Sequence, residues 1–197
     1  MKLSHAILFI LPAAAVSADP VTAAPLNITA ISSHNGYSVL ECWQLDTLPV
    51  AYLSAINYAI GNTTTATWSR IEPRTTPGEA WAPQVQLSII LNGLIRITAP
   101  APVSTTLDRP VSIADELTQG HAVAERTKAQ PKTHVAYVMP GTIQSSVLIV
   151  ADLEAVSNIR GHFTEFPSEE PTVLVQIPFE GDRVPVHRVL YESPCVG

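Results

Sequence analysis

The sequence has few charged residues, few lysines and two cysteines, and it lacks any long apolar run. Charged residues make up 14% of the 197 residues, and the formal net charge is −6. Beyond Lys2 the only lysines are Lys128 and Lys132. The chain therefore has no basic surface for nucleic acid or an anionic membrane. No segment reaches the ~18 uninterrupted apolar residues of a membrane-spanning helix, so we expect neither nucleic acid nor membrane as a partner.

The first 18 residues have the features of a secretory signal peptide. Lys2 precedes an apolar stretch that ends at Val16, and Val16-Ser17-Ala18 offers small residues at the cleavage positions. Cleavage leaves 197 − 18 = 179 residues and, by removing Lys2, changes the formal charge from −6 to −7. That length suits a single domain over residues 19–197. We predict a protein of the secretory pathway or the extracellular space.

The cysteines and two sequence triplets fit the same compartment. Cys42 and Cys195 form an even pair, which in an oxidising environment favours one disulfide that closes a long loop. Two buried free thiols are the alternative. Asn27 and Asn62 each open an Asn-X-Thr triplet, the acceptor for N-glycosylation. We predict the disulfide and glycosylation at both asparagines.

Short β-branched or alternating apolar runs recur along the chain, with most of the 17 prolines between them. Such runs predict strands, and their number indicates an all-β barrel or sandwich. From Leu45 to Ile60 the apolar residues instead have roughly helical spacing, which predicts a short helix after Pro49. Residues 100–110, rich in Pro and Thr, are predicted to form a loop. The predicted strands are Tyr37–Trp43, Thr65–Ile71, Gln84–Leu91, Leu94–Thr98, Val111–Ala114, His134–Met139, Ile143–Ala151, Val173–Phe179 and Val184–Tyr191.

The strand predicted after Pro83 carries polar residues on one face. Gln84, Gln86 and Ser88 alternate with apolar residues, so their side chains share a side. The strand ends in an Asn-Gly dipeptide, a strong hairpin signal. We therefore predict that residues 94–98 return beside it.

This stretch resembles the first motif of the cupin superfamily, in the form common among fungal cupin-like proteins. A second segment, Asp108–His121, is similar to the downstream cupin segment. The resemblance covers about residues 65–125 and implies an all-β fold: a single cupin-like jelly-roll β-barrel with one or two short helices. The matching residues of the first motif are Pro77, Gly78, Trp81, Ala82, Pro83, Gln86, Leu91 and Gly93.

The chain departs from the cupin pattern at the metal ligands. A working site resembles a cluster of His, His, Glu and His, but only His121 is present and Gln86 occupies the carboxylate position. A neutral amide is a poor ligand, and one imidazole cannot hold a transition metal. We predict no metal and no cofactor. Recruitment of His134, His162 or His187 as ligands is the alternative.

A secreted, metal-free cupin-like protein of this size resembles the small hetero-Diels–Alderases of fungal tropolone–sesquiterpenoid pathways. That resemblance implies a cofactor-independent pericyclase that joins an o-quinone methide to a terpene alkene, a small apolar polyketide–terpenoid substrate. Such a reaction needs an apolar cavity and donors that stabilise a developing oxyanion. The candidate catalytic residues are Arg70, Gln84, Gln86 and His121, and the candidate substrate-binding residues are Trp68, Trp81 and Ser88.

Several alternatives stay open. Trp68 and Arg70 share a strand face with Glu72, so a solvated outer face with an Arg–Glu pair competes with a cavity position. Trp81 can anchor the core as well as stack on a ligand. The same composition fits a secreted, non-enzymatic protein that binds a small molecule. Donors that converge on one point would indicate catalysis, and dispersed donors would indicate binding. Because cupin-like barrels often pair edge to edge, we also expect a homodimer.

Overall fold

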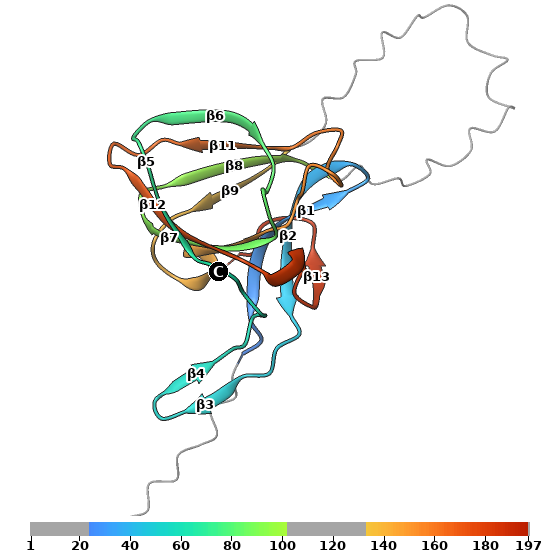
Figure 1. Ribbon diagram of the computed structural model, residues 1–197, viewed down its shortest axis with the longest axis vertical. Helices are drawn as coiled ribbons and strands as arrows, with labels where there is room; N and C mark the ends of the chain where they lie inside the picture. Colours follow the sequence, from blue (N-terminus) through green and yellow to red (C-terminus); the bar gives the residue numbers. More distant parts are fainter. Residues whose placement is uncertain (1–23, 102–132, 197) are drawn as a thin grey trace, which may run out of the picture.

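Eight strands form a jelly roll of two facing sheets (Figure 1). They are β5 (Thr67–Ile71), β6 (Thr75–Ala80), β7 (Gln86–Asn92), β8 (Ile95–Pro100), β9 (Thr133–Val138), β10 (Val147–Val150), β11 (His162–Phe166) and β12 (Thr172–Pro178). The large sheet contains the order β10-β7-β12-β5 and the small sheet is β6-β11-β8-β9. This is the strand order of two interleaved Greek keys. The predicted all-β jelly-roll fold is confirmed, although the two sheets do not close into one barrel.

The structure is a computed structural model that describes residues 24–101 and 133–196. The predicted signal peptide (residues 1–18), most of the predicted loop 100–110, the strand predicted at Val111–Ala114, and His121 lie outside the described residues. An apolar cluster lies between the sheets, and both sheets contribute to it. Its buried members are Ile31, Leu40, Ala82, Ile90, Ile95, Ile97, Ala99, Ala136, Val138, Leu148, Val150, Phe166 and Leu174.

Three more strands extend the large sheet beyond β10. They are β1 (Asn27–His34), which runs parallel to β10, then β2 (Tyr37–Leu45) and the edge strand β13 (His187–Tyr191). The predicted disulfide between Cys42 and Cys195 is confirmed and joins β2 to the C-terminal tail. The backbone N–H of Cys195 also donates a hydrogen bond of 3.0 Å to Thr29 Oγ1. The disulfide fits a secreted protein; the signal peptide and the localisation stay predictions.

The opposite face of the large sheet carries a second apolar cluster. Strand residues such as Trp43, Leu87 and Ile149 lie there beside Leu26 and Phe179, which adjoin the ends of β1 and β12. The large sheet is therefore buried on both faces in its central part, which explains why β10 is a continuous apolar run rather than an alternating one.

The predicted helix between Leu45 and Ile60 is wrong. This stretch forms a two-stranded hairpin of β3 (Val50–Tyr52) and β4 (Ala55–Asn57), which projects from the body of the molecule (Figure 1). All six strand residues are exposed. A helical apolar stripe needs a core to pack against, and residues 50–57 have none, since all of them are exposed. The helices of the described part are α1 (Ile143–Ser146) and the 3₁₀ turn η2 (Glu180–Asp182), and no helix in residues 24–101 and 133–196 could cross a membrane.

The predicted hairpin at Asn92-Gly93 is also wrong. The strands on either side, β7 and β8, belong to different sheets, so the turn carries the chain across the core. Gly93 has a φ of 83°, and a Cβ there would lie 2.5 Å from Thr172 Oγ1. The glycine therefore serves a close approach to β12 instead of a hairpin. The prediction also missed β1, β6 and β11, and the start of the predicted strand Ile143–Ala151 is α1.

Candidate functional site

Trp68 and Arg70 lie on the outer face of β5. Trp68 is 61% exposed, and Arg70 forms an ion pair with the exposed carboxylate of Glu72. The solvated outer face with an Arg–Glu pair is therefore the alternative that the structure supports. Gln84 precedes β7 and is exposed as well.

Gln86 and Ser88 face the interior of the jelly roll. Both side chains are buried, and their cross-strand neighbours on β10 are Val150 and Leu148, which belong to the cluster between the sheets. Arg70 and Gln84, in contrast, lie in solvent. The three described donors, Arg70, Gln84 and Gln86, therefore do not converge on one point.

Trp81 anchors a loop instead of lining an open cavity. Its indole Nε1 donates a hydrogen bond of 2.8 Å to the carbonyl of Ser157. Its ring lies so close to Gly161 that a Cβ on that glycine would come within 2.8 Å of Trp81 Cε2. The core-anchoring alternative for Trp81 is the one that the structure supports.

A buried polar cluster joins the two sheets, and sequence reasoning missed it. Asp152 is fully buried, and its Oδ2 accepts a hydrogen bond of 2.5 Å from Ser38 Oγ on β2. The same oxygen lies 2.6 Å from Nδ1 of His162 on β11. Asp152 Oδ1 has no partner among the described residues. Ser38 and Asp152 are 114 positions apart, so no local motif could have revealed the cluster.

The histidines proposed as alternative ligands lie apart. His162 belongs to the buried cluster, His187 stacks on Trp43 with ring centroids 3.6 Å apart, and His134 is on β9 in the small sheet. In residues 24–101 and 133–196, no three His, Cys, Asp or Glu side chains gather as metal ligands would. This part of the chain offers no metal site.

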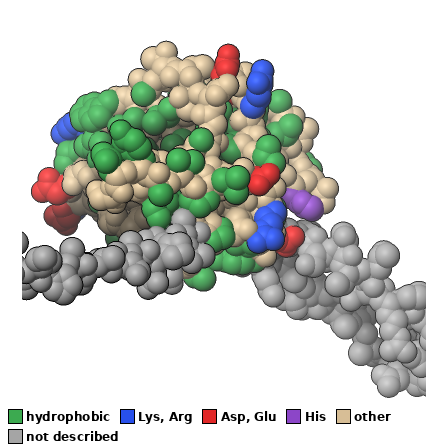
Figure 2. All heavy atoms as spheres, turned by 90° about the horizontal axis from the view of Figure 1, so that it is seen from below, with side chains coloured by type: hydrophobic (Ala, Val, Ile, Leu, Met, Phe, Trp, Pro, Cys, Tyr) green, Lys and Arg blue, Asp and Glu red, His purple; other side chains and the backbone are tan. Residues whose placement is uncertain are grey.

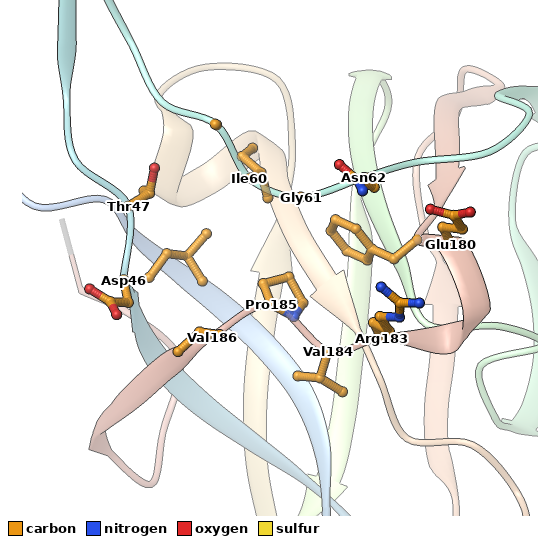
Figure 3. A pocket seen from close by; sticks show the side chains of 13 residues that line it. Asp46, Thr47, Ile60, Gly61, Asn62, Glu180, Arg183, Val184, Pro185 and Val186 are labelled. Carbon is orange, nitrogen blue, oxygen red and sulfur yellow. The ribbon is translucent and has the colours of Figure 1, made fainter.

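A pocket of about 350 Å³ lies on the outer side of the large sheet, at the base of the β3–β4 hairpin (Figure 3). Leu45 and Phe179, both buried members of the second cluster, line it. Ile60, Val184 and Val186 complete the apolar wall. The sequence prediction expected a cavity between the sheets. The first cluster lies between the sheets, and the pocket described here lies on the other face of the large sheet.

Polar side chains mark both ends of the pocket. Asp46 and Thr47 lie at one end, and Asn62, Glu180 and Arg183 at the other (Figure 3). Backbone hydrogen bonds fix the two walls, from Asp46 N to the carbonyl of Val186 (2.8 Å) and from Glu180 N to that of Asn62 (3.0 Å). None of the ion pairs among the described residues includes Arg183.

The two predicted glycosylation sites differ in their surroundings. Asn62 is exposed at the pocket rim. Asn27 lies in β1, and its Oδ1 accepts a hydrogen bond of 3.0 Å from Gln44 Nε2. Glycosylation at either position stays a prediction.

The comparisons with known proteins leave the family open. No family model matches the chain, and no curated protein matches it. Among solved structures, the chain is similar to a dTDP sugar isomerase from Desulfovibrio desulfuricans G20, with 7% sequence identity and a TM-score of 0.34. The match covers 75% of this chain and 82% of the isomerase chain. The jelly-roll assignment rests on the strand order and register described above.

Proposed function

We propose that this protein is a secreted jelly-roll protein that binds a small, largely apolar molecule in the pocket beside the β3–β4 hairpin. The observation that carries the proposal is the pocket itself, whose apolar floor of Leu45 and Phe179 is bounded by polar side chains at both ends. Ligand sites typically combine an apolar lining with a few fixed polar groups. A volume of about 350 Å³ is near the lower end of such sites, which suits a ligand of one or two rings.

The polar ends suggest how a ligand is oriented. Arg183 presents a guanidinium at the end of the pocket that Asn62 and Glu180 also line. A guanidinium is a strong donor to carboxylate, sulfonate or phenolate oxygens. The preferred ligand therefore has an apolar body and one acidic or strongly polar group, which lies toward Arg183.

A probe with this chemistry tests the proposal. We would titrate the purified secreted protein with anilinonaphthalene sulfonate, which has an aromatic body and one anionic group, and follow its fluorescence. Val184→Trp, which fills the pocket, should weaken binding at least tenfold, and Arg183→Gln should weaken it about three- to tenfold. The controls Val156→Trp and Arg188→Gln change exposed residues outside the pocket and should bind as the wild type does. Equal affinity in all five proteins would refute the site.

The hetero-Diels–Alder activity implied by the cupin-like resemblance is a second proposal. Arg183, an exposed residue at the pocket rim, gives it one donor beside apolar side chains, a position that Arg70 does not have. Incubation of the protein, with and without chelator, with a quinone-methide precursor and a humulene-type alkene tests it. A chelator-resistant adduct formed as one enantiomer, and lost in Arg183→Gln, would support the cyclase. A racemic adduct at the background rate, from protein that binds either compound, would leave binding alone as the function.

A further inference from the structure

The β3–β4 hairpin and its flanks, residues 47–59, form an apolar arm. The sequence from Thr47 to Ser69 contains no charged residue. Among the residues that the structure describes, β3 and β4 of the arm pair with each other and with no third strand. From the side on which the arm lies in Figure 1, apolar side chains are spread over much of the surface, and the charged side chains lie in a few small groups (Figure 2). The exposed large apolar residues of the arm are Leu48, Val50, Tyr52, Leu53 and Ile56.

The turn at the tip of the arm contains a residue type that such turns disfavour. Leu53 follows β3 in the turn to β4, has a φ of 53° and is 91% exposed. Two-residue hairpin turns with positive φ favour Asn or Gly, because a larger side chain is strained there. A leucine at this place is disfavoured by its backbone conformation and also by its contact with water. Such outliers are retained where the side chain has a role in binding.

We propose that this arm is the contact through which two copies of the chain associate. An isolated two-stranded hairpin is at best marginally stable in water, so the arm needs a surface that covers it. Its five large apolar side chains, each with on the order of 100 Å² of exposed apolar area, present roughly 500 Å². Two arms that cover each other bury roughly 1,000 Å² in total, which is the size of a weak, reversible interface.

The hairpin geometry favours a second copy as the partner. The outer edges of β3 and β4 carry backbone N–H and C=O groups outside the hairpin's own pairing. Two identical edges can pair antiparallel across a two-fold axis, which closes the assembly at two chains. The absence of charge along the arm lets two acidic chains approach there without repulsion. A lipid bilayer is a poorer partner, because it cannot satisfy the backbone groups of open strand edges.

The arm also adjoins the pocket, since Thr47 and Ala59 at its base line the pocket wall. Association through the arm would therefore place the two pockets next to the interface. The inference does not depend on the proposed ligand, because it rests on the exposed arm alone. A protein that dimerises without binding the probe, or binds it as a monomer, separates the two proposals.

Sedimentation velocity of the purified secreted protein, over a hundredfold range of concentration, tests the inference. We expect a monomer–dimer equilibrium for the wild type. Leu53→Gly removes the exposed apolar side chain at the tip, so the dimer dissociation constant should rise at least tenfold. The variant should fold normally, because glycine adopts a positive φ without strain. Val156→Gly, an exposed apolar residue away from the arm, is the matched control and should dimerise as the wild type does.

Three results would overturn the inference. One is a wild-type protein that stays monomeric across the whole range. Another is a dimer that Leu53→Gly leaves unchanged. The third is arm-dependent binding of the monomer to phosphatidylcholine vesicles, which would assign the arm to a membrane surface. Urea midpoints measured for each variant confirm that a change in association is not a loss of folding.

Discussion

The jelly roll and the arm are both apolar β structure, but the jelly roll buries its apolar residues and the arm exposes them. In β8 every second residue is buried between the sheets, whereas all six strand residues of the arm are exposed. The difference lies in pairing. Jelly-roll strands lie in sheets of four or more strands with a second layer above them, and the arm has two strands and no second layer. Apolar residues alone therefore do not form a core. They also need enough paired strands, or a second layer, to bury them.

Removal of the disulfide should have the largest effect on stability. Cys42 and Cys195 close a loop with a sequence separation of 153, and the entropy of that loop in the unfolded chain corresponds to about 4–5 kcal/mol. The double variant Cys42→Ala/Cys195→Ala should lose about that much in urea unfolding under non-reducing conditions. A loss below about 1 kcal/mol would mean that the tail contributes little to the fold.

A pair of isoleucine truncations sharpens the comparison between core and arm. Ile90→Ala opens a cavity between the sheets, where Ile90 is 2% exposed, and should destabilise the protein by about 3 kcal/mol. Ile56→Ala in β4 should change the stability of the monomer by less than about 0.5 kcal/mol. Urea midpoints at low protein concentration measure both. Equal losses at the two positions would show that the arm is packed against the body in solution.

The buried carboxylate gives a smaller effect. Asp152→Asn keeps the shape of the side chain but removes the charge that accepts hydrogen bonds from Ser38 and lies against His162. We expect a loss of about 2 kcal/mol, measured by thermal or urea unfolding at neutral pH. Glu169→Gln, an exposed partner of Arg74, is the control, with a loss near zero. If both variants lose equally little, the cluster does not join the sheets as described.

The smallest effect, with the opposite sign, belongs to the tip of the arm. Leu53→Gly relieves a positive φ and should stabilise the isolated monomer by up to about 1 kcal/mol. Unfolding at a concentration below the dimer range measures it. A clear loss of stability would mean that the Leu53 side chain packs against its own chain and is not free to contact a second copy.

The sequence allowed the jelly roll to be predicted better than its surroundings. The burial of Ile95–Pro100 repeats with period two, as expected of a strand, and the alternating sequence of Gln86–Asn92 also forms a strand. β6 was missed because it contains Pro77 and Gly78, which an edge strand tolerates but a propensity argument excludes. The arm was misassigned because its short apolar run has spacing compatible with a helix as well.

The candidate site could not have been predicted from local patterns. The pocket draws on Leu45, on residues 59–62 and on residues 179–186, which only the fold brings together. The residues chosen from sequence came from β5, from the segment 81–88 and from His121, and in the structure Gln86 and Ser88 are buried inside the jelly roll. Asn92-Gly93 does form a turn, as its sequence predicts. A local sequence signal does not determine which strands pair, however, and β7 and β8 lie in different sheets.

The most direct test of the account is amide hydrogen exchange of the purified protein at low and high concentration, with and without anilinonaphthalene sulfonate. We predict slow exchange in β7, β8, β10 and β12 under all conditions and fast exchange in residues 47–59 at low concentration. Concentration should protect the arm, and the probe should protect residues 59–62 and 179–186. An arm that is fully protected in the dilute monomer, together with a pocket that the probe leaves unchanged, would contradict both the arm's role and the proposed function.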